Sequence, residues 1–434
     1  MNDVKELLGF GRSKVKVLKV EQVIENNVVI QKITLVGTVK KVICPICNKY
    51  TSSVHDTLKP ANLKFNKIAE QNCIISVIKR RFICHNCKKR IIEDIGINSK
   101  KKTVSNRLEI KIRKDLLKPN FNIKQIALDN NVSHNCVRSI LKDAMTNYPN
   151  HLRTLPEVIS FDEFKADTSY GKYAFILNDP IKKKALDVLP CRKKEYLNNY
   201  FTKVENRNNV KYVISDMYEP YLLVTKIMFP KAKYVVDRFH YVTYIMDALD
   251  DIRIRLQKEF GYNSKQYKIL KNKKNVTLLR IRYGDERIKW YVYTKRYERG
   301  RYVYKLPRTI LDEMLAINDE LKRGYDLKEL FLDIINNSDY KNAEKDLLVW
   351  IDLCNQSKIT EFIEASKTIN NWLPYIVNSF IDKRFTNGFT EGLNNKIKVI
   401  KRNAYGYKNF IFFRLRLLYI LNGKLSGRSK NNDK

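Results

Sequence analysis

The spacing of hydrophobic and polar residues changes several times along the chain. After a short helix-like opening, residues 20–39 (VEQVIENNVVIQKITLVGTV) alternate between apolar and polar positions. This period of two predicts strands with one buried face. From about Val104 to Met145 the period becomes that of helices. The first third of the chain is therefore expected to pass from a strand-rich part to a helical part.

Two short helices joined by the turn NVS are predicted within this helical segment, the first starting near Phe121 or Asn122. Their apolar positions have the spacing of a helix-turn-helix core: Ile126, Ala127, Val132, Val137 and Ile140. Ser133 can cap the second helix. The residues that would then face a DNA major groove are Ser133, His134, Asn135, Arg138 and Lys142. Any helical hairpin would give the same spacing, so the neighbouring segments decide between the two interpretations.

Beyond Pro156, three short apolar segments follow one another, and two further apolar segments each run into a helical pattern. This order predicts a mixed sheet layered with helices, an α/β architecture. Ligand sites in such sheets lie at strand ends, and the acids at these ends are Asp162, Asp216 and Asp237. Burial of an unpaired carboxylate is costly. A bound cation would offset that cost.

Residues from about 262 to 380 have the pattern of a mostly helical insertion. It includes KWYVYTKRYERGRYVYKL at 289–306, whose aromatic and cationic residues alternate. Such a stretch can stack on bases, but an exposed hairpin with one buried face is the favoured interpretation. The insertion returns the chain to the predicted sheet at residue 385.

Residues 385–410 (FTNGFTEGLNNKIKVIKRNAYGYKNF) predict an amphipathic helix. Its apolar side comprises Phe389, Leu393, Ile397 and Ile400, and its polar side comprises Glu391, Asn395, Lys398 and Arg402. Taken alone, Glu391 fits a solvated helix start, where the helix dipole favours an acid. Together with Asp162 and Asp216, it is predicted to be a third metal ligand.

The formal charge of +37, spread along the whole chain, favours a polyanionic partner, and nucleic acid fits best. A membrane surface is the competing partner, but we find no run of 18 apolar residues and no signal peptide. Carboxylate oxygens suit Mg²⁺ or Mn²⁺. Two such ions about 4 Å apart can activate a water or hydroxyl and stabilise the leaving oxygen in phosphodiester displacement.

Two CxxC pairs, Cys44 with Cys47 and Cys84 with Cys87, predict a tetrahedral Zn²⁺ site. The 36 residues between the pairs require an inserted hairpin, for which NCIISVIKRRF is the candidate. His55, Cys73 and His85 are spare ligand candidates. A redox pair and unrelated buried thiols are the alternatives. A basic zinc module of this kind is expected to bind DNA or RNA.

Several motifs resemble those of bacterial insertion-sequence DDE transposases of the ISL-three family: FDEF, SDMYEPY, FPKAKYVVDRFH and TNGFTEGLNNKIKVIKRNAYGYKNF. The paired CxxC module followed by a helix-turn-helix is similar to the N-terminal half of that family. The resemblance implies a ribonuclease H-like catalytic domain with an insertion before its last acid. It also implies binding to inverted-repeat ends and magnesium-dependent strand cleavage and transfer. The catalytic acids would be Asp162, Asp216 and Glu391.

Other residues have supporting roles in this interpretation. Glu163 would point to the opposite face of its strand from Asp162, which makes it the weaker ligand candidate. Asp237 and His240 could support the metal ligands, or Asp237 could pair with Arg238. Asn395 is a further supporting candidate. Lys398, Lys401 and Arg402 are predicted to hold the DNA backbone beside Glu391.

The expected domains are a zinc module at 1–100, a helix-turn-helix domain at 101–150, the core at 151–260, an insertion at 261–380, final core helices at 381–422 and a basic tail at 423–434. The expected partners are transposon-end and target DNA and a second copy of the chain, in the cytoplasm at the nucleoid. The alternative function is a non-catalytic DNA-binding protein that kept only the recognition half.

Overall fold

The computed structural model describes residues 2–11, 13–25, 27–97, 103–149, 151–271, 294–298, 301–305, 307–403 and 409–423. The chain divides into unit 1, Met1–Pro149 with Asn395–Lys434, and unit 2, Asn150–Asn394. Residues 395–422 were expected with the catalytic core but cluster with the N-terminal half. The AYGY motif at 404–407 and the predicted tail at 424–434 lie outside the described residues.

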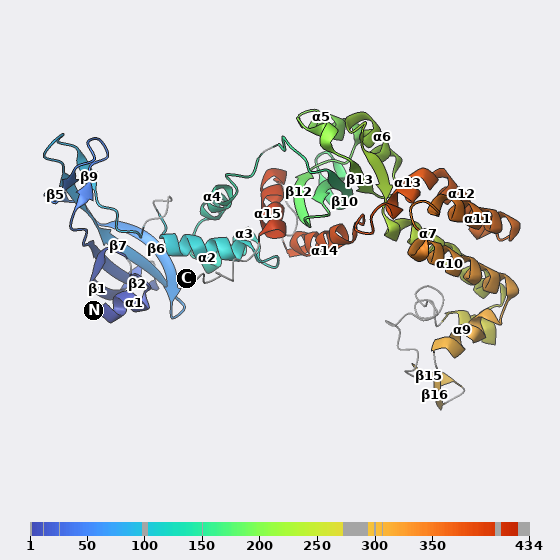
Figure 1. Cartoon of the computed structure of the whole chain (residues 1–434). Helices are drawn as coiled ribbons and strands as arrows, with labels where there is room; N and C mark the ends of the chain where they lie inside the picture. The colour runs from blue at the N-terminus through green and yellow to red at the C-terminus, as the bar shows by residue number, and fades with distance from the viewer. Residues whose placement is uncertain are drawn as a thin grey trace, which may run out of the picture. The chain divides into compact units, whose positions relative to one another are not determined.

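Unit 1 begins with helix α1 (Asn2–Leu7) and a four-stranded sheet (Figure 1). Its strands are β1 (Val15–Glu25), β2 (Val28–Gly37), β7 (Gln71–Ile78) and β6 (Ala61–Ile68), in that order. β2 and β7 are parallel, whereas the other two pairs are antiparallel. The alternation predicted strands here correctly, and Ile33, Leu35 and Ile75 are among its fully buried residues.

Two small sheets complete the strand-rich part of unit 1. β3 (Val42–Ile43) pairs with β4 (Tyr50–Thr51), and β5 (Val54–Thr57) and β9 (Arg90–Ile92) flank β8 (Arg80–Ile83). The hairpin predicted in NCIISVIKRRF is wrong, because its two halves enter different sheets as β7 and β8.

The helices of unit 1 start where their capping residues predict. α2 spans Asn106–Leu116, α3 Ile123–Asp129 and α4 His134–Ala144. Asn122 Oδ1 accepts from Gln125 N at 2.8 Å, and Ser133 Oγ accepts from Cys136 N at 3.2 Å, so both helix starts have a side-chain cap. Ile126, Ala127, Val137 and Ile140 are buried as predicted.

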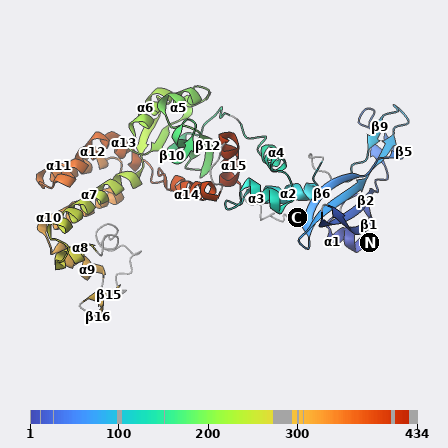
Figure 2. The same ribbon diagram turned by 180° about the vertical axis from the view of Figure 1, so that it is seen from behind.

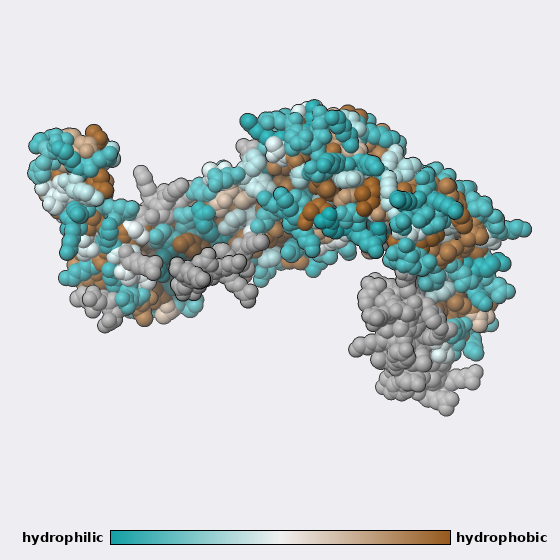
Figure 3. Space-filling view, in the orientation of Figure 1, coloured by the Kyte–Doolittle hydropathy of each residue, from teal (hydrophilic) through white to brown (hydrophobic). Residues whose placement is uncertain are grey.

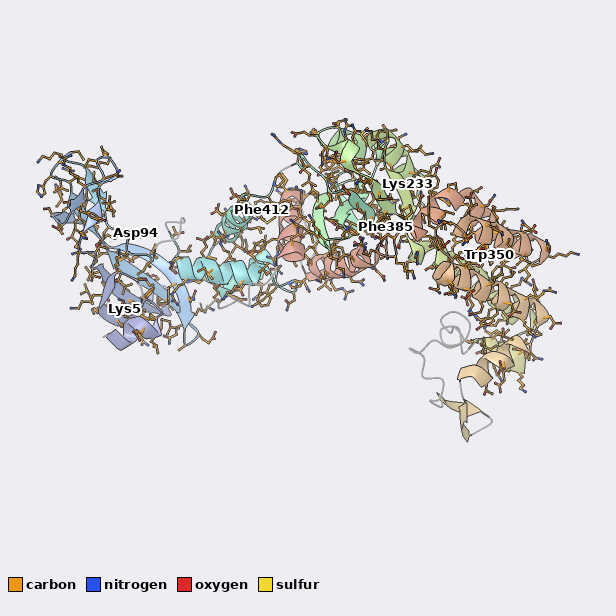
Figure 4. All side chains as sticks on the ribbon, viewed as in Figure 1. Lys5, Asp94, Lys233, Trp350, Phe385 and Phe412 are labelled. Atoms are coloured by element: carbon orange, nitrogen blue, oxygen red, sulfur yellow. The ribbon has the colours of Figure 1, made fainter. Side chains whose placement is uncertain are left out.

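Helix α15 (Phe410–Asn422) packs against α2 and α4. The buried side chain of Arg416 donates to Lys118 O at 3.1 Å and to Phe121 O at 2.8 Å, and Tyr419 Oη donates to Arg113 O at 3.2 Å. These contacts explain why the end of the chain clusters with unit 1. Phe412, labelled in Figure 4, belongs to this helix.

Unit 2 contains the predicted mixed sheet. Its order is β12 (Lys184–Leu189), β11 (Gly171–Asp179), β10 (Val158–Thr168), β13 (Tyr212–Ser215) and β14 (Lys233–Val236). β10, β13 and β14 are parallel, and β11 is antiparallel to both of its neighbours. The predicted meander of three strands followed by strand–helix units is therefore confirmed.

Helices cover both faces of this sheet. Three helices follow β12 and β13: α5 (Lys194–Phe201), the short η1 (Arg207–Asn209) and α6 (Glu219–Met228). The stacked rings of Phe161 and Phe201 lie on the same side of the sheet as these helices. On the other face Phe385 packs against Ile214 and Val235 (Figure 4). The long helix α7 (Arg238–Glu259) follows β14.

The insertion is mostly helical, as predicted, over its described residues. It comprises α8 (Lys265–Lys271), the hairpin β15 (Thr294–Glu298) and β16 (Arg301–Lys305), α9 (Pro307–Leu315), α10 (Asp319–Asn337), α11 (Ala343–Gln356), α12 (Thr360–Asn371), α13 (Leu373–Val377) and η3 (Asn378–Phe380). Residues 272–293, part of the predicted insertion, lie outside the described residues.

Helices α7, α10, α11 and α12 lie side by side (Figures 1 and 2). The fully buried Trp350 anchors them, and its Nε1 donates to Leu327 O at 2.8 Å. Hydrophilic side chains predominate on the face shown in Figure 3. None of the described helices is long and apolar enough to cross a membrane.

Candidate active site and metal centre

Asp162 and Asp216 lie at the same level of two neighbouring parallel strands. Ser160 of β10 pairs with Ile214 of β13. Each acid is two residues further along, on strands that are about 4.8 Å apart. Asp216 directly follows the last residue of β13, as predicted, whereas Asp162 lies in the middle of β10 (Val158–Thr168) and does not end its strand. The sheet therefore brings together two of the three acids predicted from the sequence.

The environment of Asp162 disfavours a negative charge. Burial, and next the charge of Asp216, raise the pKa of Asp162 to about 7. Glu163 N donates to Asp162 Oδ1 at 2.7 Å, and Asn394 Nδ2 donates to Asp162 Oδ2 at 2.9 Å. Two carboxylates held close together with few cations nearby are the arrangement that a divalent cation stabilises.

Asp216 is held by residues of the next strand and helix. Tyr234 Oη donates to Asp216 O at 2.7 Å, which fixes the backbone after β13. His240 Nε2 lies 2.6 Å from Asp216 Oδ1. Burial lowers the pKa of His240, but the hydrogen bond and charge of Asp216 outweigh it and raise that pKa above its ordinary value. His240 thus contacts a candidate ligand directly, as the sequence analysis anticipated.

Glu391 lies in the first turn of α14 (Gly388–Asn403), and its side chain is exposed. One turn later, Asn394 contacts Asp162, and the buried Thr390 accepts from Asn178 Nδ2 at 3.1 Å. Within the described part of the chain, however, the three acids do not form a cluster whose oxygens all lie within 4.8 Å. The structure brings the helix of Glu391 to Asp162 through Asn394.

The contact to Asp162 comes from Asn394 and not from the predicted Asn395, which is exposed. Successive helix residues differ by about 100° in direction, so only one of two adjacent asparagines can face the sheet. The position three residues after Glu391 lies on the same side of the helix as Glu391. Asn395, four residues after Glu391, shares that side, so the spacing alone does not choose between the two asparagines.

Asp237 is 1% exposed and joins the end of β14 to the start of α14. Its Oδ1 accepts from Asn387 N at 2.8 Å, and burial raises its pKa. The alternative pair with Arg238 is not seen, because Arg238 Nη2 donates to Ser379 O at 3.0 Å. Asp237 therefore supports the segment that carries Glu391.

Glu163 lies on the opposite face of β10, as the strand alternation predicts. One of its oxygens pairs with Arg192 Nη1, and the other accepts from Tyr221 Oη at 2.7 Å. Both oxygens are therefore engaged, which leaves Asp162 as the better metal ligand of the two neighbours.

The four predicted zinc ligands form one cluster in unit 1. Their Sγ atoms all lie within 4.8 Å of one another, with 3.3 Å between Cys44 and Cys87 and 3.6 Å between Cys47 and Cys84. Backbone hydrogen bonds, the largest from Cys47, lower the pKa of Cys44 to about 6. Four thiols with a lowered pKa among them suit a zinc ion. The spare candidates His55, Cys73 and His85 are outside this cluster.

The predicted DNA-binding residues of α4 are exposed: Ser133, His134, Asn135, Arg138 and Lys142. The Arg138 guanidinium and the Lys142 ammonium lie 5.1 and 5.2 Å from the ring centre of Phe412 in α15. Lys398 and Arg402 of α14 are also exposed, and Lys401 is half-buried. These cations are accessible to a ligand.

Comparison with known proteins adds an independent observation. The model of a family described as "Transposase", of the ISL-three DDE type, matches residues 159–417, more than half of the chain. The chain belongs to this family. It is also 24% identical over 391 residues to "Transposase for insertion sequence element IS1001" of Bordetella parapertussis, a match that covers 89% of this chain and 90% of that protein. This transposase is thus similar to an insertion-sequence transposase along nearly all its length.

A second relative, the "ATP-dependent protease" of Lactococcus lactis subsp. lactis, is 36% identical over 110 residues. That match covers 25% of the transposase and 33% of the relative. The protease activity belongs to the relative, and a match of this extent does not extend it to the transposase.

The acid site of the transposase has the donors that magnesium prefers. They are the carboxylate oxygens of Asp162 and Asp216 and the Oδ1 atom of Asn394, from the helix that carries Glu391. This Oδ1 atom is buried without a hydrogen-bond partner among the described residues. Oxygen donors of this type fit Mg²⁺ or Mn²⁺, whereas the four thiols of unit 1 fit zinc. The oxygen donors of the acid site and the thiols of the cysteine cluster therefore suit different metals.

Proposed function

We propose that this chain is a DDE transposase that binds the inverted-repeat ends of an insertion sequence and catalyses magnesium-dependent strand cleavage and strand transfer. The observation that carries the proposal is that Asp162 in β10 lies level with Asp216, which directly follows the adjacent parallel strand β13. Asn394, from the helix that bears Glu391, is bonded to the first of them. A ribonuclease H-like core is the corresponding proposal for the fold of unit 2.

Asp162, Asp216 and Glu391 are the proposed magnesium ligands. The raised pKa of Asp162 supports this role, since a bound cation would offset the burial and the neighbouring charge of Asp216 that raise it. Bound magnesium would polarise the scissile phosphate and lower the pKa of the attacking water or hydroxyl. Glu391 is on the same side of α14 as Asn394, so a change of its side-chain rotamer would turn the carboxylate toward Asp162.

The protein groups around the acids have positioning roles in this proposal. His240 and Tyr234 hold Asp216, while Asn394 orients Asp162. Asp237 fixes the start of α14 through Asn387 N. Such supporting groups keep ligands in the arrangement that in-line displacement requires.

DNA recognition is assigned to unit 1. The cysteine cluster would hold Zn²⁺, and the exposed face of α4 would read the element end as a helix-turn-helix. Lys398, Lys401 and Arg402 would bind the DNA backbone. The pairing of two transposon ends favours a homodimer. The proposed DNA partners are the transposon ends and the target DNA, and the proposed location is the nucleoid.

The test is strand cleavage of DNA taken from either side of the coding region, with Mg²⁺, by wild type, Asp216→Ala and Asp251→Asn. Asp251 is an exposed acid of α7 and serves as the charge-matched control. We expect wild type and Asp251→Asn to cut at the repeat end and Asp216→Ala to bind without cutting. A wild type that binds these ends but never cuts would show the non-catalytic alternative instead.

A further inference from the structure

Arg192 is held in a cluster of side chains around Glu163, on the face of β10 opposite to Asp162. Its guanidinium pairs with Glu163 and lies between two aromatic rings, 4.3 Å from the ring centre of Tyr173 and 4.8 Å from that of Tyr218. Tyr221, which is fully buried, donates to Glu163 at 2.7 Å and packs against Tyr218 with 4.9 Å between ring centres. We call these five residues the Arg192 cluster.

The cluster fixes the guanidinium before any ligand arrives. A free arginine side chain loses rotamer freedom on binding, which weakens the interaction. Here a carboxylate and two ring faces already restrain Arg192, and stacking of this type is specific to the flat guanidinium group. Such an arrangement suits recognition of a ligand more than it suits a simple surface ion pair.

The guanidinium also keeps donors that the protein does not use. Arginine has five N–H donors, and the hydrogen bond to Glu163 engages only Nη1. Within the described ranges no other residue accepts a hydrogen bond from Arg192, and 27% of its side chain is exposed. A flat edge with free donors matches the oxygens of a phosphate group.

The position of the cluster identifies the source of that phosphate. Glu163 directly follows Asp162, and Tyr218 is two residues after Asp216, at most about 7 Å along the chain. The Asp216 loop therefore contacts His240 with one side chain and Arg192 with another. Arg192 is on the other face of β10 from Asp162, but Tyr218 of this loop connects it to Asp216, so a DNA strand that follows the loop away from the acids would reach Arg192.

We propose that Arg192 binds a backbone phosphate of the cleaved DNA strand next to the scissile phosphate. This assignment rests on the proposed function, which supplies the strand. Arg192 acts in positioning, while Glu163, Tyr173 and Tyr218 set the orientation of its guanidinium.

The first experiment measures binding without catalysis. The probe is a fluorescein-labelled duplex from the DNA that flanks the coding region, titrated with full-length protein in EDTA at several KCl concentrations. We expect Arg192→Gln to weaken binding about fivefold and to lower the salt slope by about 1, as loss of one phosphate contact predicts. Arg192→Lys, which keeps the charge but not the planar fork, should keep the slope and bind less tightly than wild type.

The matched control is Lys231→Gln. Lys231 is exposed and precedes β14, at the opposite end of the parallel strands from the acids. The Lys231→Gln substitution removes one positive charge from the same unit. We expect the DNA affinity and the salt slope of this variant to equal those of wild type. Equal effects of Arg192→Gln and Lys231→Gln would show a general charge effect and overturn the proposal. A lower melting temperature of Arg192→Gln with an unchanged salt slope would show a structural role and overturn it as well.

The second experiment adds Mg²⁺ and measures cleavage kinetics. Arg192→Gln should raise KM with little change in kcat, because the contact is made to the strand in both ground and transition states. An unchanged KM in an active enzyme removes the Arg192 assignment alone. A wild type that never cuts removes the proposed function, while the salt slope in EDTA still reports on the phosphate contact.

Discussion

The cysteine cluster and the acid site are both candidate metal centres, but they differ in how complete they are. The four thiols lie within 4.8 Å of one another, whereas the three acids do not converge to that extent among the described residues. Structural zinc sites are closed by four protein ligands, while catalytic sites leave positions open for water and substrate. On the proposed function, the first centre would stabilise the fold by binding zinc, and the second would be completed by a metal ion and DNA.

The largest expected effect is loss of the cysteine site. Cys44→Ser should reduce the zinc content from about one ion per chain to near zero and unfold the strands around the cluster, because binding of structural zinc contributes folding free energy. Metal analysis and circular dichroism would measure this. Retention of a wild-type melting curve after removal of the zinc would show that the cluster is not structural.

Asp162→Asn should have the next largest effect, on catalysis. We expect cleavage to fall about 10³-fold or more because the charge of one proposed ligand is lost. DNA binding should stay within about twofold, since the proposed recognition residues lie mainly in unit 1. In EDTA at pH 8 the variant should be more stable than wild type, because the buried carboxylate, whose pKa is raised to about 7, is ionised there at a cost of about 4 kcal/mol. A less stable variant in thermal unfolding would contradict the stated electrostatics of the acid site.

Asn394→Leu should have a moderate effect. It removes the hydrogen bond that orients Asp162, and loss of such a supporting group typically costs about 10- to 100-fold in metal affinity or activity. The apparent Mg²⁺ requirement of cleavage should rise, whereas the zinc content stays at the wild-type value. The control is Asn395→Leu, at the exposed neighbouring position, which should cleave like wild type.

Glu163→Gln should have the smallest effect on catalysis. Both carboxylate oxygens bind protein groups, so the change should alter cleavage by less than about threefold. Comparison with Asp162→Asn tests adjacent residues of one strand in the same assay. A loss as large as that of Asp162→Asn would mean that Glu163 is the metal ligand.

Elements with strong local signals were predictable from the sequence. The five strands of unit 2 follow from apolar segments and their order, and the starts of α3 and α4 follow from the caps Asn122 and Ser133. The amphipathic faces of α14 agree as well, with Leu393, Ile397 and Ile400 buried and Glu391 exposed.

Features that depend on distant parts of the chain were not predictable. β7 pairs with β2 across about forty residues, and no local pattern in NCIISVIKRRF indicates that partner. Likewise, α15 packs on α2 and α4 through contacts such as Arg416 with Lys118 O, between residues nearly 300 positions apart. The choice of Asn394 over Asn395 required the rotation of α14 about its axis, which one helix turn of sequence does not determine.

Because side chains alternate between the two faces of β10, the register of this strand decides whether Asp162 or Glu163 faces the proposed metal site. Asp162 and Glu163 have opposite environments because a strand turns each successive side chain to the other face. Deletion of a single residue earlier in β10 would exchange the two faces. It would place Glu163 at the position of Asp162, in the proposed metal site, and Asp162 at the position of Phe161, among the rings of Phe175, Phe201 and Tyr221. Homologues and engineered variants should therefore tolerate many substitutions in this strand, but insertions and deletions only in pairs.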